Sequence, residues 1–379
     1  MAELRLAKDI SRHVRLGHPW IYRDALAPGK AARGAVVDVV ARGGAHVARG
    51  FFDPDGPLAV RVLALAPVAL DEAWLHGRVA RAAAIRTAAR IDSDGVRLLH
   101  GEGDFVPGLV LDRYAGVGAV RFDGAAAEAF WRPRLPAIAA AAGEAGYPLG
   151  RVWSRRGEAL AGDAPEPVVM REGEARFEVD VVHGQKTGFF LDQRGNRARV
   201  GELAAGARVL NVFAYTGGFS VAAGLGGARA VTTVDVAAPA IAAARRNLER
   251  NGLPAGELVA ADAFAFLEEA RAAGRTWDLV ICDPPSFAPR ADAVARALRA
   301  YRTLNRAAAA VVAASGLLVT ASCSSHVTAP DFRAAVAAGL TDARRDARLL
   351  DARGAGPDHP VLPAFPEGEY LKVLYVAVS

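Results

Sequence analysis

The chain of 379 residues is too long for one ordinary hydrophobic core, so we expect two or three domains. Its composition, 52% hydrophobic and 23% charged, is that of a soluble globular protein, and the lack of any run of about 18 apolar residues excludes a membrane-spanning helix. The two cysteines, Cys282 and Cys323, exclude a disulfide framework and favour a reducing cytoplasm, and the mixed-charge first residues indicate no secretory signal.

The basic charge is concentrated at one end. The net charge is +5, and basic residues outnumber acidic ones in the first 33 residues. The basic residues there are Arg5, Lys8, Arg12, Arg15, Arg23, Lys30 and Arg33, and the acidic ones are Glu3, Asp9 and Asp24. This end suits contacts with phosphates, although a biased genome composition would also raise the arginine count.

The first 68 residues predict a small β-barrel or sandwich. Short apolar runs predict strands at 36–40, 45–52 and 58–65. The glycines Gly43 and Gly44 provide the turn between the first two. The indole of Trp20 could stack on a nucleic-acid base, but filling the interior of the barrel is the interpretation we favour.

Residues 69–180 predict a small α+β domain. Helices are expected at 71–90 and 125–142, strands at 95–99, 109–114, 117–122 and 150–154, and a hairpin at 168–182. Glu102, Asp104 and Asp112 lie near glycine turns of this region. Three acids could form a metal site, but acids beside glycine turns are usually turn formers, and we expect no metal.

From residue 181 onward, apolar strands alternate with helices. Strands are expected at 208–213, 230–235, 257–261, 277–283, 317–322, near Leu349 and at 369–378, and the helices between them include 238–251 and 331–338. This alternation predicts a parallel, doubly wound sheet. Ligands of such sheets bind beyond the carboxyl ends of the strands, so the residues that end each strand are the ones to examine.

The first of these strands runs into a glycine turn and a helix. Gly217 and Gly218 supply backbone without a Cβ where a ligand must approach closely. The second strand ends in Asp235, about 20 residues downstream, where an acid would hold a pair of ribose hydroxyls. The spacing of the dinucleotide fingerprint is absent, which disfavours NAD and FAD and leaves other adenosine ligands open. A plain glycine-stabilised α/β connection would carry the same pattern.

The next three strands also end in residues with useful chemistry. They end at Asp262-Ala263, at Asp283-Pro284-Pro285-Ser286-Phe287 and at Ser322-Cys323-Ser324. Acids and a thiol at these positions favour a catalytic site at this edge of the sheet.

Together these strand ends resemble a class I S-adenosylmethionine-dependent methyltransferase. The resemblance implies that Asp235 contacts the ribose, that Asp262 contacts the adenine amine and that Asp283-Pro284-Pro285 marks the reaction site. Three further segments point to one group within these methyltransferases. They are residues 183–194, Phe213-Ala214-Tyr215-Thr216-Gly217-Gly218-Phe219 and Ser322-Cys323-Ser324. With these motifs the chain is similar to the bacterial 23S ribosomal RNA cytosine-C5 methyltransferases that carry an N-terminal PUA domain.

The likeness extends over the whole chain, through His18-Pro19-Trp20, residues 109–114 and the closing Asp358-His359-Pro360. It implies a PUA-like, RNA-binding β-barrel at 1–68, a central α+β domain at 69–180, and a Rossmann-like methyltransferase domain at 181–379 with strand order 3-2-1-4-5-7-6. The implied cofactor is S-adenosyl-L-methionine, and the implied partner is large-subunit ribosomal RNA. No membrane partner is expected, and a homodimer is left open.

The resemblance also assigns site residues. Those implied to bind the cofactor are Gln193, Arg194, Phe213, Tyr215, Thr216, Gly217, Gly218, Asp235, Asp262, Ala263 and Asp283. Those implied to contact the RNA are Lys186, Pro284, Pro285 and Phe287. An Arg194 held in an ion pair, or a Phe287 that only caps the following helix, would give the same sequence. Ser286 departs from the lysine that often follows Asp-Pro-Pro in the family, which removes a charge next to the target base.

Cys323 is the predicted catalytic nucleophile. C5 of cytosine is too weak a nucleophile to attack a sulfonium methyl group unaided, and a thiolate that adds to C6 activates it. Asp283, at the end of the neighbouring strand, would act with it by neutralising the ring near N3. The structural alternative for Cys323 is a small buried residue, and Cys282, on the opposite face of its strand, is expected to pack in the core.

We therefore predict a cytoplasmic enzyme that forms 5-methylcytosine in 23S ribosomal RNA through a covalent cysteine adduct at C6. Two alternatives remain. The same fold would also serve methylation of a guanine ring nitrogen or an exocyclic amine of ribosomal RNA, and analysis of the product separates these reactions. A chain whose methyltransferase domain is inactive would act as an RNA-binding or ribosome-assembly protein, and failure to bind the cofactor would favour it.

Overall fold

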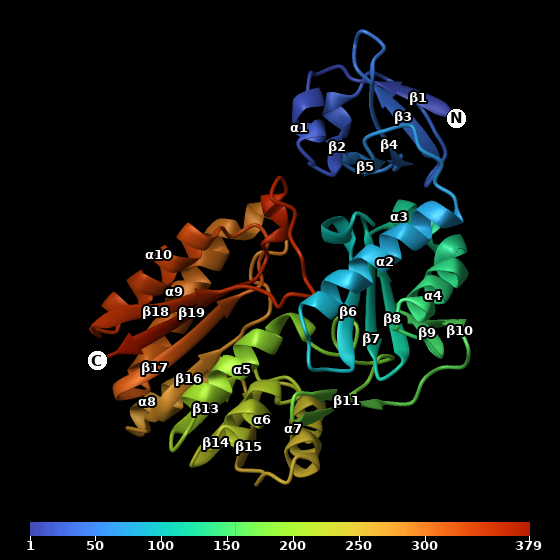
Figure 1. The fold of residues 1–379 in the computed structure, drawn as a ribbon. Helices are drawn as coiled ribbons and strands as arrows, with labels where there is room; N and C mark the ends of the chain where they lie inside the picture. The colour runs from blue at the N-terminus through green and yellow to red at the C-terminus, as the bar shows by residue number, and fades with distance from the viewer. Residues whose placement is uncertain (156) are drawn as a thin grey trace. The chain divides into compact units, whose positions relative to one another are not determined.

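The computed structural model describes residues 1–155 and 157–379. The chain forms two compact units, and neither is continuous in sequence (Figure 1). Unit 1 comprises Met1–Met170, Val179–Leu191 and Pro357–Gly368, and unit 2 comprises Arg171–Glu178, Asp192–Gly356 and Glu369–Ser379. The three domains expected at 1–68, 69–180 and 181–379 stay a prediction. None of the helices in the described ranges has both the length and the apolar character that spanning a membrane requires.

The N-terminal part of unit 1 is a five-stranded sheet with the order β1-β3-β4-β5-β2. Its strands are β1 Ala2–Arg5, β2 Trp20–Tyr22, β3 Val36–Val40, β4 His46–Phe52 and β5 Leu58–Ala64, with the short helix α1 Ser11–Arg15. Three of these strands match the predicted ones, whereas β1 and β2 are too short to give a readable alternation in sequence. Their apolar side chains, among them Leu4, Val37 and Val39, form one core.

Trp20 does not fill this core, so the interpretation favoured from the sequence is wrong. The residue is only partly buried, and its indole Nε1 donates a hydrogen bond to Oε1 of Glu102 over 2.8 Å. Arg61 of β5 donates to the same oxygen over 2.6 Å. Phe51 of β4 stacks on Phe130, with ring centroids 4.9 Å apart. These contacts tie the N-terminal sheet to the rest of unit 1.

The second part of unit 1 is a sheet with the order β10-β9-β8-β7-β6. Its strands are β6 Gly95–His100, β7 Leu109–Tyr114, β8 Val117–Phe122, β9 Arg151–Ser154 and β10 Glu158–Ala161, and its helices are α2 Glu72–Ala88, α3 Ala125–Trp131 and α4 Leu135–Glu144. The prediction of one helix at 125–142 is wrong. Pro133 and Pro136 lack the N–H that a continuous helix needs, and a 3-10 turn at Arg132–Arg134 separates α3 from α4.

The three acids considered as metal ligands each pair with an arginine. The pairs are Arg61–Glu102 at 2.6 Å, Arg86–Asp104 at 2.6 Å and Arg97–Asp112 at 2.7 Å. Within residues 1–155 and 157–379, no group of three or more His, Cys, Asp or Glu side chains is arranged to hold a metal ion. The carboxylates therefore serve as partners of buried arginines in the fold.

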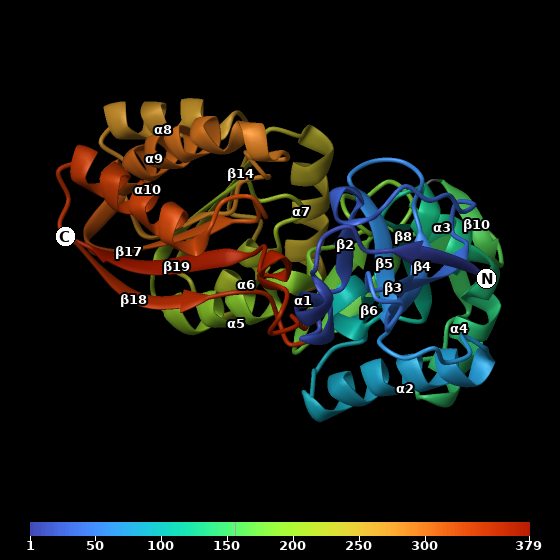
Figure 2. The ribbon, with the colours of Figure 1, turned by 90° about the horizontal axis from the view of Figure 1, so that it is seen from above.

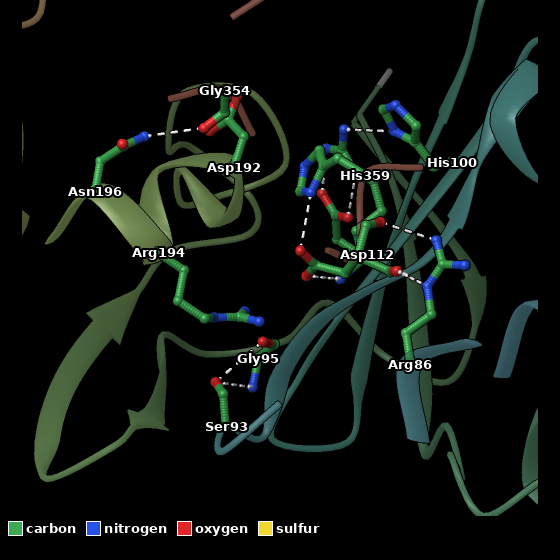
Figure 3. A network of polar contacts seen from close by, with 12 residues as sticks. Arg86, Ser93, Gly95, His100, Asp112, Asp192, Arg194, Asn196, Gly354 and His359 are labelled. Atoms are coloured by element: carbon green, nitrogen blue, oxygen red, sulfur yellow. Dashed lines mark hydrogen bonds and ion pairs between the residues drawn. The ribbon is translucent and has the colours of Figure 1, made fainter. Parts of the chain in front are cut away.

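A late segment of the chain, Pro357–Gly368, completes this polar network. Arg86 donates to the carbonyl oxygen of Asp358 over 2.8 Å, and Oδ2 of Asp358 accepts the N–H of Arg97 over 3.1 Å. The ring centroid of His359 lies 4.9 Å from that of His100. Figure 3 shows Arg86, His100 and His359 within the network. The Asp358-His359-Pro360 motif thus has a structural role in unit 1.

Unit 2 is built on a seven-stranded sheet with the order β15-β14-β13-β16-β17-β19-β18. Its strands are β13 Arg208–Val212, β14 Ala230–Asp235, β15 Glu257–Ala260, β16 Trp277–Cys282, β17 Val312–Ser322, β18 Ala347–Arg353 and β19 Lys372–Val378. This is the predicted order 3-2-1-4-5-7-6. All neighbours are parallel except β19, which is antiparallel to β17 and β18. The carboxyl ends of the first five strands therefore meet at one edge.

Helices cover both faces of this sheet, as Figure 2 shows. One face carries α8 Ala263–Ala272, α9 Val294–Ala310 and α10 Ala329–Asp342, and the other carries α5 Arg194–Leu203 and α6 Gly218–Leu225, with α7 Ala238–Arg250 against α6. Cys282 of β16 is fully buried among the side chains of the first face, which confirms its predicted core role. Burial, and to a lesser extent Asp283, raises the pKa of its thiol. The predicted hairpin at 168–182 is β11 Val168–Glu172 with β12 Ala175–Val179.

Candidate active site

The turn after β13 has a strained backbone. Phe213, Tyr215 and Gly217 have positive φ angles of 59°, 47° and 79°. Left-handed backbone at a residue other than glycine costs on the order of 1 kcal/mol, so strain is stored where a ligand was predicted to bind. Position 217 requires glycine, because a Cβ there would lie 2.9 Å from the Cβ of Ala244 on α7. Helix α6 begins directly afterwards, at Gly218.

Asp235, at the end of β14, holds this turn in place. Its Oδ2 accepts the N–H of Tyr215 over 2.8 Å, and its Oδ1 accepts the N–H of Ala237 over 2.9 Å. Each oxygen keeps a second lone pair for a ligand hydroxyl. Within the described part of the chain, the buried Oγ1 of Thr216 has no hydrogen-bond partner. A carboxylate with spare acceptor capacity beside an unpaired buried hydroxyl fits a polar ligand such as a nucleoside.

Asp262 is the N-cap of helix α8. Its Oδ1 accepts the N–H groups of Phe264 and Ala265, both over 3.0 Å, and the residue is exposed. This cap leaves Oδ2 for a donor on a ligand. Ala263, the first residue of the helix, is buried. Asp262 therefore has a structural role in addition to the binding role expected of it.

Val236 is an exposed apolar residue that was not singled out from the sequence. It follows the acid at the end of β14, and 74% of its surface is exposed. A large apolar side chain left open at a ligand-binding edge offers a surface for the flat face of a base. The sequence signal is an apolar residue between a strand-ending acid and the next helix.

The ends of β16 and β17 meet. The strands are parallel neighbours, with Cys282 opposite Thr320. Cys323, which follows β17, is partly exposed, and its Sγ lies 3.9 Å from the carbonyl oxygen of Pro284. Asp283 directly precedes that proline. The acid motif and the thiol therefore share one edge of the sheet, as the predicted strand order required.

Ser324 organises the loop after Cys323. Its Oγ lies 3.0 Å from the Oγ of Ser286 and 2.9 Å from the hydroxyl of Tyr301 on α9. Ser286 of the Asp-Pro-Pro motif is thus bonded to the residue after the predicted nucleophile. Burial raises the pKa of the Tyr301 hydroxyl, and the charge of Cys323 adds to the rise.

The residues that follow Asp283 differ in their exposure. Pro285 is exposed, whereas Phe287 is partly buried and packs against Tyr301 with ring centroids 4.9 Å apart. The N-cap of α9 is Ala293, so Phe287 does not cap that helix. Contact of Pro284, Pro285 and Phe287 with RNA stays a prediction.

Lys372, the first residue of β19, was also missed from the sequence. Its side chain is buried, and Nζ donates to the carbonyl oxygens of Ser324 over 2.7 Å and Val327 over 2.8 Å. Burial lowers the pKa of the amine to about 8, against an opposing effect of the Cys323 charge. The available signal was a lone lysine at the start of an otherwise apolar strand.

Gln193 and Arg194 lie at the start of α5. Gln193 is buried and accepts the side-chain N–H of Asn196 over 2.7 Å. Asn196 also donates to the carbonyl oxygen of Gly354 over 3.1 Å, as Figure 3 shows. Arg194 donates to Glu172 over 3.1 Å. Burial would raise the pKa of Glu172, but Arg194 and its neighbour Arg197 outweigh it and lower the value. The ion pair considered for Arg194 is present, and contact of either residue with the cofactor stays a prediction.

Lys186 belongs to unit 1. Its backbone is left-handed, with a φ angle of 52°, and its Nζ lies 4.3 Å from the ring centroid of Phe190. Its predicted contact with RNA stays a prediction.

Comparison with known protein families gives two matches. Residues 135–359 match the family described as S-adenosylmethionine-dependent methyltransferase, and residues 4–65 match a PUA-like domain. Among curated relatives, a ribosomal RNA large subunit methyltransferase of Deinococcus radiodurans is 41% identical, over 99% of this chain and 97% of the relative. A ribosomal RNA large subunit methyltransferase I of Shewanella amazonensis is 37% identical, over 95% of each.

Solved structures share the fold over the whole chain. A Streptococcus mutans protein described as a SAM-dependent methyltransferase superposes with a TM-score of 0.86 at 24% identity, covering 100% of both chains. A protein described as a methyltransferase and solved in complex with SAH gives a TM-score of 0.87, also at 24% identity and 100% coverage of both chains.

Proposed function

The chain belongs to the S-adenosylmethionine-dependent methyltransferases and carries a PUA-like domain, and from that membership we propose that it forms 5-methylcytosine in large-subunit ribosomal RNA. The substrate class is supported by the names of relatives that align over nearly their whole length. The choice of atom rests on one observation, the partly exposed Cys323 thiol beside the Asp283-Pro284-Pro285 motif.

The residues that would hold the cofactor lie around the strained turn. Asp235 would accept hydrogen bonds from the ribose hydroxyls, and the buried hydroxyl of Thr216 would form a hydrogen bond with the cofactor. Asp262 would accept a hydrogen bond from the adenine amine, and Val236 would cover the face of the base. When bound, S-adenosylmethionine supplies an electrophilic methyl group. Because the turn is already held by Asp235, little ordering remains for the binding step.

Cys323 and Asp283 would carry the chemistry on the base. The thiolate adds to C6, which forms an S–C6 bond and moves the ring electrons toward C5, and a proton from Asp283 or solvent at N3 neutralises the ring. After C5 has taken the methyl group, it loses its proton to solvent. The electrons of that C–H bond re-form the C5–C6 double bond as the S–C6 bond breaks, which returns the thiolate. No net oxidation occurs, and the ring proton at N3 is released again.

RNA binding would be divided between the units. A base in a helix cannot reach a thiol at a sheet edge, so the target cytosine must leave its stack. The basic N-terminal residues would contribute affinity through phosphate contacts and little base-specific information.

Product analysis tests the proposal. Large-subunit RNA from cells that lack the gene, incubated with the purified protein and labelled S-adenosylmethionine, should yield label only in 5-methylcytidine after digestion to nucleosides. Label on a guanine or on an exocyclic amine would replace the carbon chemistry with the nitrogen alternative. A protein that binds the cofactor and RNA but transfers no label would favour a role in ribosome assembly.

A further inference from the structure

Lys372 is a buried cation next to the predicted nucleophile. Only 7% of the residue is exposed, and its Nζ is bonded to two carbonyl oxygens. In the described part of the chain it forms no salt bridge with a carboxylate. Hydrogen bonds to two carbonyl groups offset only part of the desolvation free energy of a buried ammonium, so keeping Lys372 charged there costs free energy. Such a charge is a candidate for a functional role.

The geometry places Lys372 across the loop that carries Cys323. Strand β19 runs antiparallel to β17, with Lys372 directly opposite Ser322. Its side chain then reaches forward to Ser324 and Val327, which are themselves joined by the Val327 N–H to Ser324 carbonyl bond of 3.2 Å. Lys372 therefore contacts the chain before and after Cys323 and fixes both ends of the turn that follows it.

The thiol and the amine also influence each other electrostatically. The negative charge of Cys323 favours the charged form of Lys372. Interaction between two titrating groups is mutual, so the Lys372 ammonium favours the Cys323 thiolate to the same extent. The thiolate, and not the thiol, is the nucleophilic form of cysteine.

The other ionisable groups around the thiol do not supply this charge. Asp283, next to Pro284, would oppose a thiolate, and Tyr301 on α9 is uncharged at neutral pH with its pKa raised by burial. His326 lies on the same turn as Cys323 and is exposed to solvent, which screens its charge. Lys372, in contrast, is a cation that two hydrogen bonds hold in a buried position near the cysteine loop.

We propose that Lys372 is a positioning residue for Cys323, an inference that rests on the proposed function. Lys372 holds the loop that carries Cys323 and provides the buried positive charge that stabilises the Cys323 thiolate. Lys372 does not touch the substrate in this role. It acts through the cysteine.

The test measures the thiol itself, without RNA or cofactor. The rate at which iodoacetamide alkylates Cys323 in the full chain is followed against pH, with the site identified by peptide mass mapping. Lys372→Gln keeps hydrogen-bond donors for the two carbonyls but removes the charge. We expect its alkylation midpoint to rise by about one pH unit, with about tenfold slower alkylation at neutral pH. Lys8→Gln, which removes an exposed lysine of unit 1, is the matched control and should leave the midpoint unchanged.

A folded Lys372→Gln protein whose midpoint equals that of the wild type would overturn the proposal. Folding is checked by the melting temperature and by binding of S-adenosylhomocysteine. Should that variant not fold, Lys372→Arg carries the test, because a guanidinium keeps its charge at every pH used. Its midpoint should stay at or below that of the wild type, and a higher midpoint would also overturn the idea. Methylation on nitrogen, in contrast, would defeat the proposed reaction and leave the alkylation result intact.

Discussion

Unit 1 and the loop around Cys323 in unit 2 both bury charge, but they neutralise it differently. In unit 1 the side chains of Arg86 and Asp104 are 0% exposed and lie 2.6 Å apart, and Arg97 of β6 lies 2.7 Å from Asp112. In unit 2 the ammonium of Lys372 is bonded to backbone carbonyls and interacts electrostatically with Cys323. A buried ion pair that is complete needs nothing further from a ligand. A buried cation without a carboxylate partner can stabilise a neighbouring group that becomes negatively charged during a reaction.

From this difference we expect mutations at the two places to have different effects, on folding in unit 1 and on turnover at the cysteine loop. Disturbing the complete pairs of unit 1 should affect stability first. Disturbing the loop of Cys323 should affect chemistry first, because the thiol is partly exposed.

The largest effect should come from Cys323→Ala. Removal of the nucleophile should lower the rate of methyl transfer by on the order of 10⁴-fold or more, while the melting temperature and the affinities for S-adenosylhomocysteine and RNA stay close to wild type. Single-turnover transfer of labelled methyl groups measures the loss. A mutant that methylates at the normal rate would remove the covalent route.

The matched control is the second cysteine. RNA with 5-fluorocytosine at the target should remain covalently attached to the wild-type protein, because C5 then has no proton to lose. Cys282→Ala should still become trapped, since that thiol is fully buried in the core, and Cys323→Ala should not.

The next largest effect should come from Asp104→Asn in unit 1. This change leaves the Arg86 guanidinium buried without its counter-charge and should lower the free energy of unfolding by about 3–5 kcal/mol. Urea unfolding followed by tryptophan fluorescence reports mainly on this unit, which contains Trp20, Trp74, Trp131 and Trp153, whereas unit 2 contains Trp277. Cofactor affinity measured below the transition should be unchanged. A loss of affinity without a loss of stability would contradict the contrast between the units.

A smaller effect is expected from Asp235→Ala in unit 2. The change removes the acceptor of the Tyr215 N–H and the predicted ribose contact, and should weaken binding of S-adenosylhomocysteine by about 1.5–3 kcal/mol. Isothermal calorimetry measures this loss, and NAD should show no comparable binding to either protein. Equal affinities for the cofactor product would refute the ribose assignment.

The smallest effect concerns pH and the His100 imidazole of unit 1. Burial lowers the pKa of His100 well below 6.5, and the nearby Arg97 and His359 add to this. The unfolded chain therefore takes up a proton near pH 6.5 that the folded chain does not. Stability from this group is complete above about pH 6.5 and is lost as the pH falls below it, by up to about 1.4 kcal/mol per pH unit.

The measurement is urea unfolding of the wild type and of His100→Gln between pH 7 and pH 5, by tryptophan fluorescence. The slope of stability against pH should be smaller in the variant. His183→Gln, which removes an imidazole that is 83% exposed, should keep the wild-type slope. Parallel curves for all three proteins would show that His100 accepts its proton in the folded state as well.

Local sequence patterns were sufficient for the sheet of unit 2. Its central parallel strands are mostly apolar, and a residue with a distinct predicted role stands at or just after the end, such as Asp235 in β14 or Asp283 after β16. The carboxyl ends of adjacent parallel strands lie side by side, so the strand order predicted that Asp283 and Cys323 lie at the same edge of the sheet. The break between α3 and α4 was also visible, because Pro133 and Pro136 lie inside the run that was read as one helix.

Contacts between residues that are far apart in sequence could not be predicted from local patterns. Lys372 reaches Ser324 across 48 positions of sequence, and only the antiparallel register of β17 and β19 brings them together. The partner of Trp20, Glu102, likewise lies 82 positions away, in the 3-10 turn after β6, so local sequence predicted a core residue. A side chain with both an apolar ring and a donor can satisfy either environment, and local pattern does not choose between them.

The position of β19 has a consequence for protein synthesis. This strand follows β18 in the sequence, yet it inserts between β17 and β18, and β18 pairs with no other strand of the described sheet. As the chain leaves the ribosome, β18 must wait as an unpaired edge until the segment Pro357–Gly368 and then β19 have emerged. Lys372 arrives with that last strand. The hydrogen bonds of Lys372 to Ser324 and Val327 can therefore form only after the glycine turn and Asp235 have been synthesised. The loop that carries Cys323 is the last part of the predicted site to gain its contacts.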